Sequence, residues 1–195
     1  MPSKKIKTPI EPGLIFHIYN RGNNYQNVFF RDEDYTLFLE KMKMYLKDYC
    51  SIFAFALLPN HYHLLLRINP FSDGLTFSKQ FSKLILSYTN KVNFRERRDG
   101  NLFLSYFRRI EIKEESYLRR LVYYINNNPV KHNLTKNPDE YKFSSYHILL
   151  SDKPTMLNRQ EVLSWFGGLD EFLEYHAFLR DEGLSIQLCL EEEQD

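Results

Sequence analysis

Two short apolar runs separated by only two residues constrain the fold of this chain more than any other feature. Residues 51–58 and 61–68 are rich in Phe, Ala, Leu and Ile, and Pro59-Asn60 between them are turn formers. Parallel strands need a crossover of a dozen or more residues, so a connection this short makes the two runs an antiparallel hairpin. We therefore expect an antiparallel sheet.

Patterns on either side of the hairpin predict two further strands and three helices. The resulting order is βαββαβ with a trailing helix, which Pro129 is expected to stop. This order is typical of an α+β fold, the ferredoxin-like or RRM-like antiparallel sheet with helices packed on one face. The predicted strands are 14–19, 51–58, 61–68 and 102–112, and the predicted helices are 32–49, 75–93 and one whose apolar face begins at Leu118.

The length of 195 residues suits one core with appended helices. We expect residues 1–135 to form the sheet domain and residues 136–195 to be an appendage packed on it, with helices near 160–166 and 171–179. The chain has no apolar run of about 18 residues and no signal-peptide pattern at its start. A cytoplasmic protein without a membrane partner is expected.

The net charge of +1 conceals an uneven distribution. Residues 79–120 carry eleven Lys and Arg against five acids, whereas residues 151–195 carry three basic and eleven acidic residues. A basic central surface is a feature of nucleic-acid-binding proteins, although solvated helix faces explain it equally well.

His61 and His63 are the most informative pair of residues. Side chains alternate along a strand, so the two imidazoles face one side while Tyr62 faces the other. Burying both without partners would cost about 1 to 3 kcal/mol each, so the pair requires hydrogen bonds, solvent or a metal ion. From spacing alone, two histidines with ordinary partners are a better explanation than a metal site, because the pair lacks a third ligand.

The following helix supplies the remaining candidates. Tyr124 and Asn128 are four residues apart, so they lie one turn from each other at the edge of the apolar stripe. Tyr123 is rotated about 100° from Tyr124 and is expected to point closer to solvent. Two imidazoles and an amide oxygen would leave open positions on Mg²⁺ or Mn²⁺ for a phosphate oxygen and water. A tyrosine hydroxyl, with an ordinary pKa of about 10, needs such a polarised phosphate to act as a nucleophile.

At this point the sequence resembles the HUH-type single-tyrosine transposases of the insertion-sequence class, and most closely the REP-associated tyrosine transposases. The matching segments span most of the chain in the same order. They are Tyr19–Asn23, Leu58–His63, Ser87–Asn90, Gly100–Phe103, Tyr124–Lys131 and Phe143–Tyr146. Leu104 departs from the pattern, because relatives often carry Gln there.

The resemblance implies a role for each candidate. His61 and His63 correspond to the two metal-binding histidines, Asn128 to the metal ligand of the palindrome-associated branch, and Tyr124 to the nucleophile. The implied substrate is single-stranded DNA with hairpins, which is cut and rejoined through a 5′-phosphotyrosine link with Mg²⁺ or Mn²⁺ as cofactor. A homodimer stays open, because shorter relatives exchange the tyrosine helix between subunits.

Five basic residues are candidate DNA contacts by position and charge. Two other functions remain to be distinguished from the enzyme. One is a catalytically silent module that binds single-stranded nucleic acid on the same sheet, and the other is a scaffolding protein. The candidate contacts are Arg21, Lys83, Arg108, Arg109 and Lys131.

Overall fold

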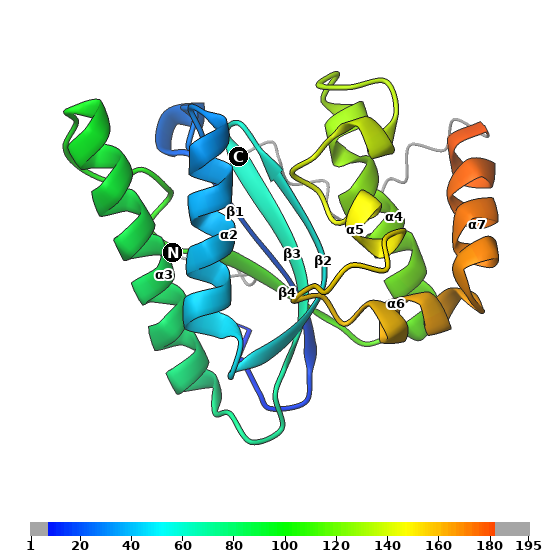
Figure 1. The fold of residues 1–195 in the computed structure, drawn as a ribbon. Coiled ribbons are helices and arrows are strands. Elements are labelled where there is room, and N and C mark those ends of the chain that lie inside the picture. The colour runs from blue at the N-terminus through cyan, green and yellow to red at the C-terminus, as the bar shows by residue number, and fades with distance from the viewer. Residues whose placement is uncertain (1–7, 182–195) are drawn as a thin grey trace.

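The computed structural model describes residues 8–181, which contain four strands and six α-helices (Figure 1). The strands are β1 (Ile15–Arg21), β2 (Cys50–Leu58), β3 (His61–Ile68) and β4 (Arg108–Ile112). The helices are α2 (Asp32–Leu46), α3 (Gly74–Glu96), α4 (Glu115–Lys131), α5 (Tyr146–Leu149), α6 (Arg159–Phe166) and α7 (Leu169–Asp181). Two single 3₁₀ turns, Asn23–Tyr25 and Pro138–Glu140, complete the set.

The strands form one antiparallel sheet in the order β2-β3-β1-β4. This is the ferredoxin-like order, so the predicted α+β fold class is confirmed. Tyr19 of β1 lies opposite His63 on β3 and opposite Arg108 on β4. Directly paired residues share a face, so these three side chains project from the same side of the sheet.

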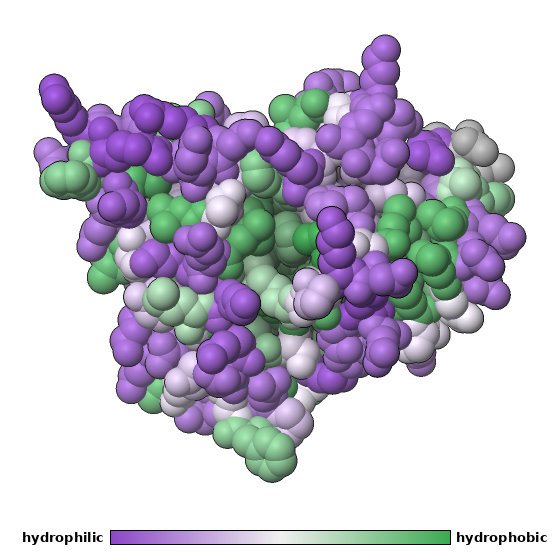
Figure 2. All heavy atoms as spheres, in the orientation of Figure 1, coloured by the Kyte–Doolittle hydropathy of each residue, from purple (hydrophilic) through white to green (hydrophobic). Residues whose placement is uncertain are grey.

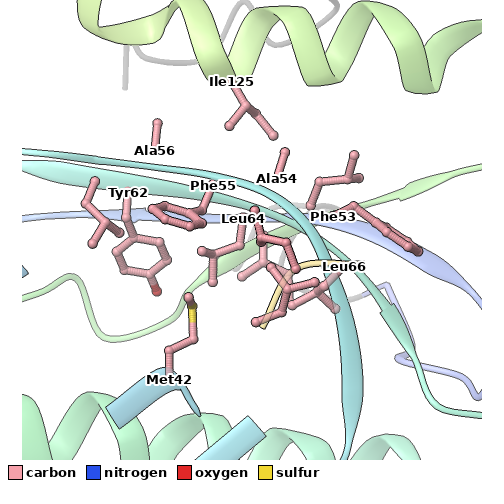
Figure 3. Close-up of a cluster of buried hydrophobic side chains, with 14 of the residues drawn as sticks. Met42, Phe53, Ala54, Phe55, Ala56, Tyr62, Leu64, Leu66 and Ile125 are labelled. Atoms are coloured by element: carbon pink, nitrogen blue, oxygen red, sulfur yellow. The ribbon is translucent and has the colours of Figure 1, made fainter. Parts of the chain in front are cut away.

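Helices cover both faces of the sheet. α2 and α3 pack on one face, and α4 crosses the other (Figure 1). In Figure 3, Met42 of α2 lies on the same side as Tyr62, whereas Ile125 of α4 lies over Ala54 and Ala56. The small alanine side chains let α4 approach β2 closely, and burial of Ile125 contributes about 2 kcal/mol.

The segment after α4 covers the edge of β2. The Leu57 N–H donates to the Phe143 carbonyl (3.0 Å), and the Ser145 N–H donates to the Phe55 carbonyl (2.8 Å). The Ser145 hydroxyl also donates to the Asn126 side chain on α4 (2.6 Å). Pairing satisfies backbone groups that an open edge would expose, and it ties the edge strand to α4.

The fourth strand is shorter than predicted. Residues 102–107 instead form a loop around the end of β1, where the Leu104 N–H donates to the Arg21 carbonyl (3.0 Å). Leu102 and Phe103 are buried in this loop. The apolar pattern that predicted a strand therefore belongs to loop residues that enter the core.

The prediction that Pro129 stops the trailing helix was wrong, because α4 continues through it to Lys131. Proline removes a single backbone donor, and only the last turn of the helix follows it. That turn is closed by the His132 N–H, which donates to the Asn128 carbonyl (3.0 Å). Proline near a helix C-terminus is therefore tolerated here without a break.

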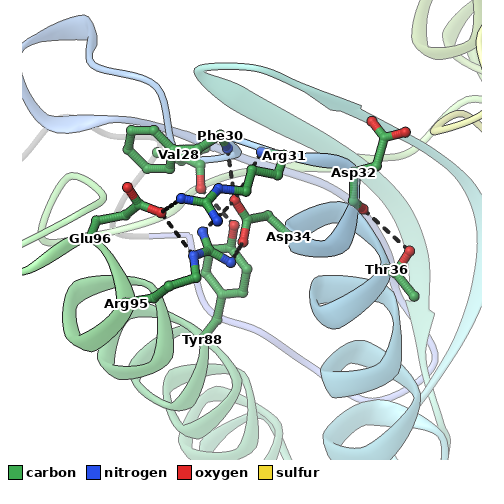
Figure 4. Close-up of polar contacts among 9 residues, drawn as sticks. All are labelled: Val28, Phe30, Arg31, Asp32, Asp34, Thr36, Tyr88, Arg95 and Glu96. Carbon is green, nitrogen blue, oxygen red and sulfur yellow. Dashed lines mark hydrogen bonds and ion pairs between the residues drawn. The ribbon is translucent and has the colours of Figure 1, made fainter.

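A buried carboxylate joins α2 to α3 (Figure 4). Asp34 is fully buried and pairs with the guanidinium of Arg95 at 2.6 and 2.8 Å. Its carboxylate also accepts the N–H groups of Phe30 (2.8 Å) and Arg31 (3.1 Å) at the start of α2. Burial alone would raise the pKa of Asp34, but Arg95 and these N–H donors outweigh it and hold the pKa below its ordinary value.

The C-terminal helices pack against both α4 and β2. Trp165 of α6 contacts Phe53 of β2 with ring centroids 4.7 Å apart, and Glu161 forms a two-pronged ion pair with Arg67 of β3 (2.6 and 2.9 Å). On α7, the ring centroid of His176 is 5.3 Å from that of Tyr123. The helices predicted near 160–166 and 171–179 are present, although residues 182–195 lie outside the described range.

The expectation that Tyr123 points toward solvent was wrong, since only 4% of it is exposed. The side of α4 that carries Tyr123 is covered by α7, and the spacing of residues along α4 contains no information about that helix.

Within residues 8–181, no helix combines the length and the apolar character needed to cross a bilayer. Figure 2 shows polar residues over most of the visible surface, with apolar residues in a hollow between α2 and the C-terminal part.

Candidate active site

Two histidines at the start of β3 face α4. His61 and His63 are both buried, and their ring centroids are 5.1 Å apart. Strand alternation sends Tyr62 to the opposite face, where its ring lies 5.2 Å from Phe38 and 5.6 Å from Phe103. The two imidazoles are therefore neighbours on the face predicted from the sequence.

Helix α4 brings Tyr124 and Asn128 to the same place. The Tyr124 ring meets His63 edge-on at a centroid distance of 5.7 Å. Asn128 is fully buried, and its Nδ2 donates to the Tyr124 carbonyl one turn earlier (3.0 Å). This bond orients the amide so that its oxygen is the atom left for the site. The fold thus assembles four residues predicted from the sequence, Tyr124, His61, His63 and Asn128.

The tautomer of His61 follows from its neighbour. His61 Nδ1 donates to the side-chain oxygen of Asn60 (2.7 Å), so the lone pair of the neutral ring is on Nε2. Asn128 lies close enough to favour the protonated form of His61. Nevertheless, neither His61 Nε2 nor Asn128 Oδ1 makes a well-aligned hydrogen bond within the described residues. Two buried acceptor atoms without donors are what a cation site requires.

Both imidazoles are held in the neutral form. Burial, followed by the nearby charges of His132 and Lys131, lowers the pKa of His61 to about 3. Burial, followed by the charges of His17 and His61, lowers the pKa of His63 well below its usual value. A neutral ring keeps the lone pair that a metal ion binds, so the residues fit a divalent cation. In the described part of the chain, no three His, Cys, Asp or Glu side chains form such a group by themselves, and the buried amide oxygen of Asn128 is a further acceptor atom at this place.

A pocket of about 170 Å³ opens beside the histidines. Arg21 and Arg108 are part of its wall, and the guanidinium carbon of Arg21 lies 3.6 Å from the ring centroid of Tyr25. Positive charge beside neutral imidazoles suits a phosphate group. The lining residues are Tyr19, Asn20, Arg21, Tyr25, Asn60, His61, Tyr62, His63, Leu104, Arg108 and His132.

The five basic residues chosen from the sequence separate into two groups. Lys131 lies beside Tyr124, with its Nζ 5.1 Å from the ring centroid, so it joins Arg21 and Arg108 on the histidine face. Arg109 pairs with Ile18 on the opposite face, where its Nε donates to the Thr8 carbonyl and burial lowers its pKa. Lys83 lies exposed on α3, which covers that opposite face as well.

No protein-family profile matches the sequence, and no curated protein is significantly similar to it. A solved structure of a REP-associated tyrosine transposase bound to a REP hairpin does match, with a TM-score of 0.65 and 22% identity. The match covers 79% of this chain and 89% of the transposase. This chain has the fold of a REP-associated tyrosine transposase.

Sequence reasoning missed three residues of the candidate site: His17, Tyr19 and His132. His17 and Tyr19 alternate on β1, so the pairing of β1 with β3 was needed to place them beside His63. His132 follows Asn128 by four residues, and its ring centroid is 4.8 Å from that of His61. The helical repeat after Asn128 was the available signal, but the expected stop at Pro129 concealed it.

Proposed function

We propose that this protein cleaves and rejoins single-stranded DNA at hairpin-flanked sites through a covalent link between Tyr124 and a 5′-phosphate. One observation carries the proposal: Tyr124 lies against His63 on the face where His61 and Asn128 present unsatisfied acceptors. The fold shared with a transposase bound to a hairpin supports the same class of substrate.

His61, His63 and Asn128 would hold a Mn²⁺ or Mg²⁺ ion. When bound, this ion would supply positive charge that polarises the phosphate under attack. The surrounding residues bind and orient the DNA. Arg21 and Arg108 would neutralise backbone phosphates at the pocket wall.

In the covalent step the Tyr124 oxygen attacks phosphorus, and the bond from phosphorus to the 3′-oxygen breaks. The hydroxyl proton of Tyr124 leaves the nucleophile, and the departing 3′-oxygen takes up one proton, so charge is conserved. The products are a 5′-phosphotyrosine and a free 3′-hydroxyl. Reversal of the same step with another 3′-hydroxyl rejoins the strand. Because Tyr124 is beside the histidines of its own chain, we propose that it acts within one subunit.

The test incubates the protein with labelled hairpin DNA from the flanks of its own gene, with Mn²⁺ or EDTA, and separates the products under denaturing conditions. We expect a metal-dependent protein–DNA adduct that Tyr124→Phe abolishes while hairpin binding stays nearly intact.

Tyr123→Phe is the matched control, because Tyr123 is adjacent in sequence but lies under α7. It should retain the adduct. An adduct that survives Tyr124→Phe would refute the assignment of the nucleophile. Hairpin binding without any adduct in Mn²⁺ would support the silent binding module instead.

A further inference from the structure

The two histidines of the site are held by different kinds of partner. Asn60 accepts the Nδ1 proton of His61 through an amide oxygen. The Nδ1 of His63 instead faces the Nε2 of a third imidazole, His17, at 3.0 Å. An amide oxygen can only accept a hydrogen bond, whereas an imidazole ring nitrogen can either donate or accept one, depending on the tautomer. The state of His63 therefore depends on the state of His17.

His17 is fixed in this position by its surroundings. It is buried in the middle of β1, its ring is stacked with that of Tyr19 (5.0 Å, 25°), and it lies nearly parallel to the His63 ring and edge to edge with it (5.2 Å, 17°). The Tyr124 ring meets it edge-on at 6.4 Å. A ring packed on several sides cannot rotate away, so its Nε2 stays directed at His63.

Two proton arrangements satisfy the hydrogen bond between these rings. If His17 Nε2 carries the proton, His63 Nδ1 accepts the hydrogen bond. The neutral His63 ring must then carry its own proton on Nε2, which blocks metal binding at that atom. If His63 Nδ1 carries the proton, His17 Nε2 accepts the hydrogen bond, and the lone pair of the His63 ring lies on Nε2. Only the second arrangement is compatible with the metal site.

We infer that His17 is a positioning residue that accepts a hydrogen bond from the Nδ1–H group of His63. This bond keeps the lone pair of the His63 ring on Nε2, where it can bind a metal ion. His17 then fixes the tautomer of His63, just as Asn60 fixes the tautomer of His61. Partners of this kind typically change metal affinity about 10- to 100-fold. The inference rests on the proposed function, because it needs the metal site described there.

The experiment compares two variants in the full-length protein without DNA. His17→Phe keeps a stacked ring but removes the acceptor, and His17→Gln restores an acceptor without the ring. Mn²⁺ affinity is measured by titration calorimetry. We expect His17→Phe to weaken binding about 10- to 100-fold and His17→Gln to recover most of that loss.

A second measurement reports the proton directly. In ¹⁵N-labelled, metal-free protein, the ring nitrogens of His63 should show a proton on Nδ1 in the wild type and in His17→Gln. In His17→Phe, His63 should show a larger share of the other tautomer. Circular dichroism and hairpin binding establish that each variant is folded.

Each outcome separates the inference from the proposed function. If the wild-type protein binds no Mn²⁺, or binds Mn²⁺ as tightly as His61→Ala does, the proposed metal site is wrong and the inference fails with it. If the wild type binds Mn²⁺ through His61 but His17→Phe binds equally well, only the role of His17 is overturned. The role is also overturned if His17→Gln binds no better than His17→Phe, since restoring the hydrogen-bond acceptor would then have no effect on the affinity.

Discussion

Adjacent cations on this sheet lie in different surroundings because strand register decides which face each one occupies. Arg108 and Arg109 are adjacent in sequence, but Arg108 is opposite Tyr19 and lines the pocket, whereas Arg109 is opposite Ile18 on the far side. Charge and position in the sequence could not distinguish them. The pairing of β4 with β1 does.

Arg108→Ala should weaken binding of single-stranded hairpin DNA, and it should reduce the salt dependence of the affinity by about 0.7 in log–log slope, the share of one phosphate contact. The measurement is fluorescence anisotropy at several KCl concentrations. Lys83→Ala removes an exposed charge from the other side of the molecule and serves as the control. Equal effects of both substitutions would show that the histidine face is not the DNA-binding face.

Much of the site could be predicted at this scale. The two-residue repeat of β3 placed His61 and His63 together, and the four-residue repeat of α4 placed Tyr124 near Asn128. His17 could not be predicted, because it approaches His63 from a strand 46 positions away in sequence. Local periodicity describes one element and carries no information about its neighbours.

At the scale of elements, the contact between α2 and α3 depends on one buried charge. Asp34 at the start of α2 both caps that helix and pairs with Arg95 near the end of α3. Removing one partner of a buried ion pair typically costs about 3 to 5 kcal/mol, because the other charge is left without compensation. The packing of α2 against α3 is therefore expected to be sensitive to the loss of either charge.

Asp34→Asn should lower the free energy of unfolding by about 3 kcal/mol at pH 7. The folded protein holds the pKa of Asp34 below its ordinary value of 3.8, so the carboxylate stabilises the fold above about pH 4. That contribution is lost as the pH falls through the lower folded pKa.

Urea denaturation at pH 7 and near pH 3 measures this dependence, and the gap between wild type and Asp34→Asn should narrow at the lower pH. Asp32→Asn, an exposed neighbour paired with Lys142, is the control and should change stability little. A gap of constant size would mean that the stabilisation does not come from the ionised carboxylate.

The types and order of the elements followed from the sequence, except for the short helix α5, which was not predicted. Among the element ends that differ, two have a clear physical cause. The loop at 102–107 has strand-like composition because its buried residues fill the core. The last turn of α4 persists beyond Pro129 because only one donor is lost there. In both places the tertiary environment outweighs the local signal.

At the scale of the whole molecule, the C-terminal helices and the sheet share one set of apolar contacts. Phe172 of α7 is fully buried against Tyr146 and Phe166, and Trp165 of α6 contacts β2. The division between residues 1–135 and 136–195 stays a prediction from sequence, and these contacts make it testable. A shared core implies that both parts unfold together.

Trp165 is the single tryptophan, so its fluorescence reports on the C-terminal helices, while far-ultraviolet circular dichroism reports on the whole chain. We expect coincident unfolding midpoints. Phe172→Ala should move both midpoints together and cost about 3 to 5 kcal/mol. Phe178→Ala on the same helix removes a side chain that is 58% exposed and should have little effect. An earlier transition in fluorescence alone would show an independently unfolding appendage.

The hydrogen bond from the Asn128 amide to the Tyr124 carbonyl ties these two residues together, so they move with the same turn of α4. In the proposed reaction, the tyrosine carries the severed strand and the amide holds the cation. Any tilt that withdrew α4, and with it the DNA end, would also remove a ligand from the ion. Under the proposed function, the incoming 3′-end would therefore move to Tyr124, while α4 stays in place.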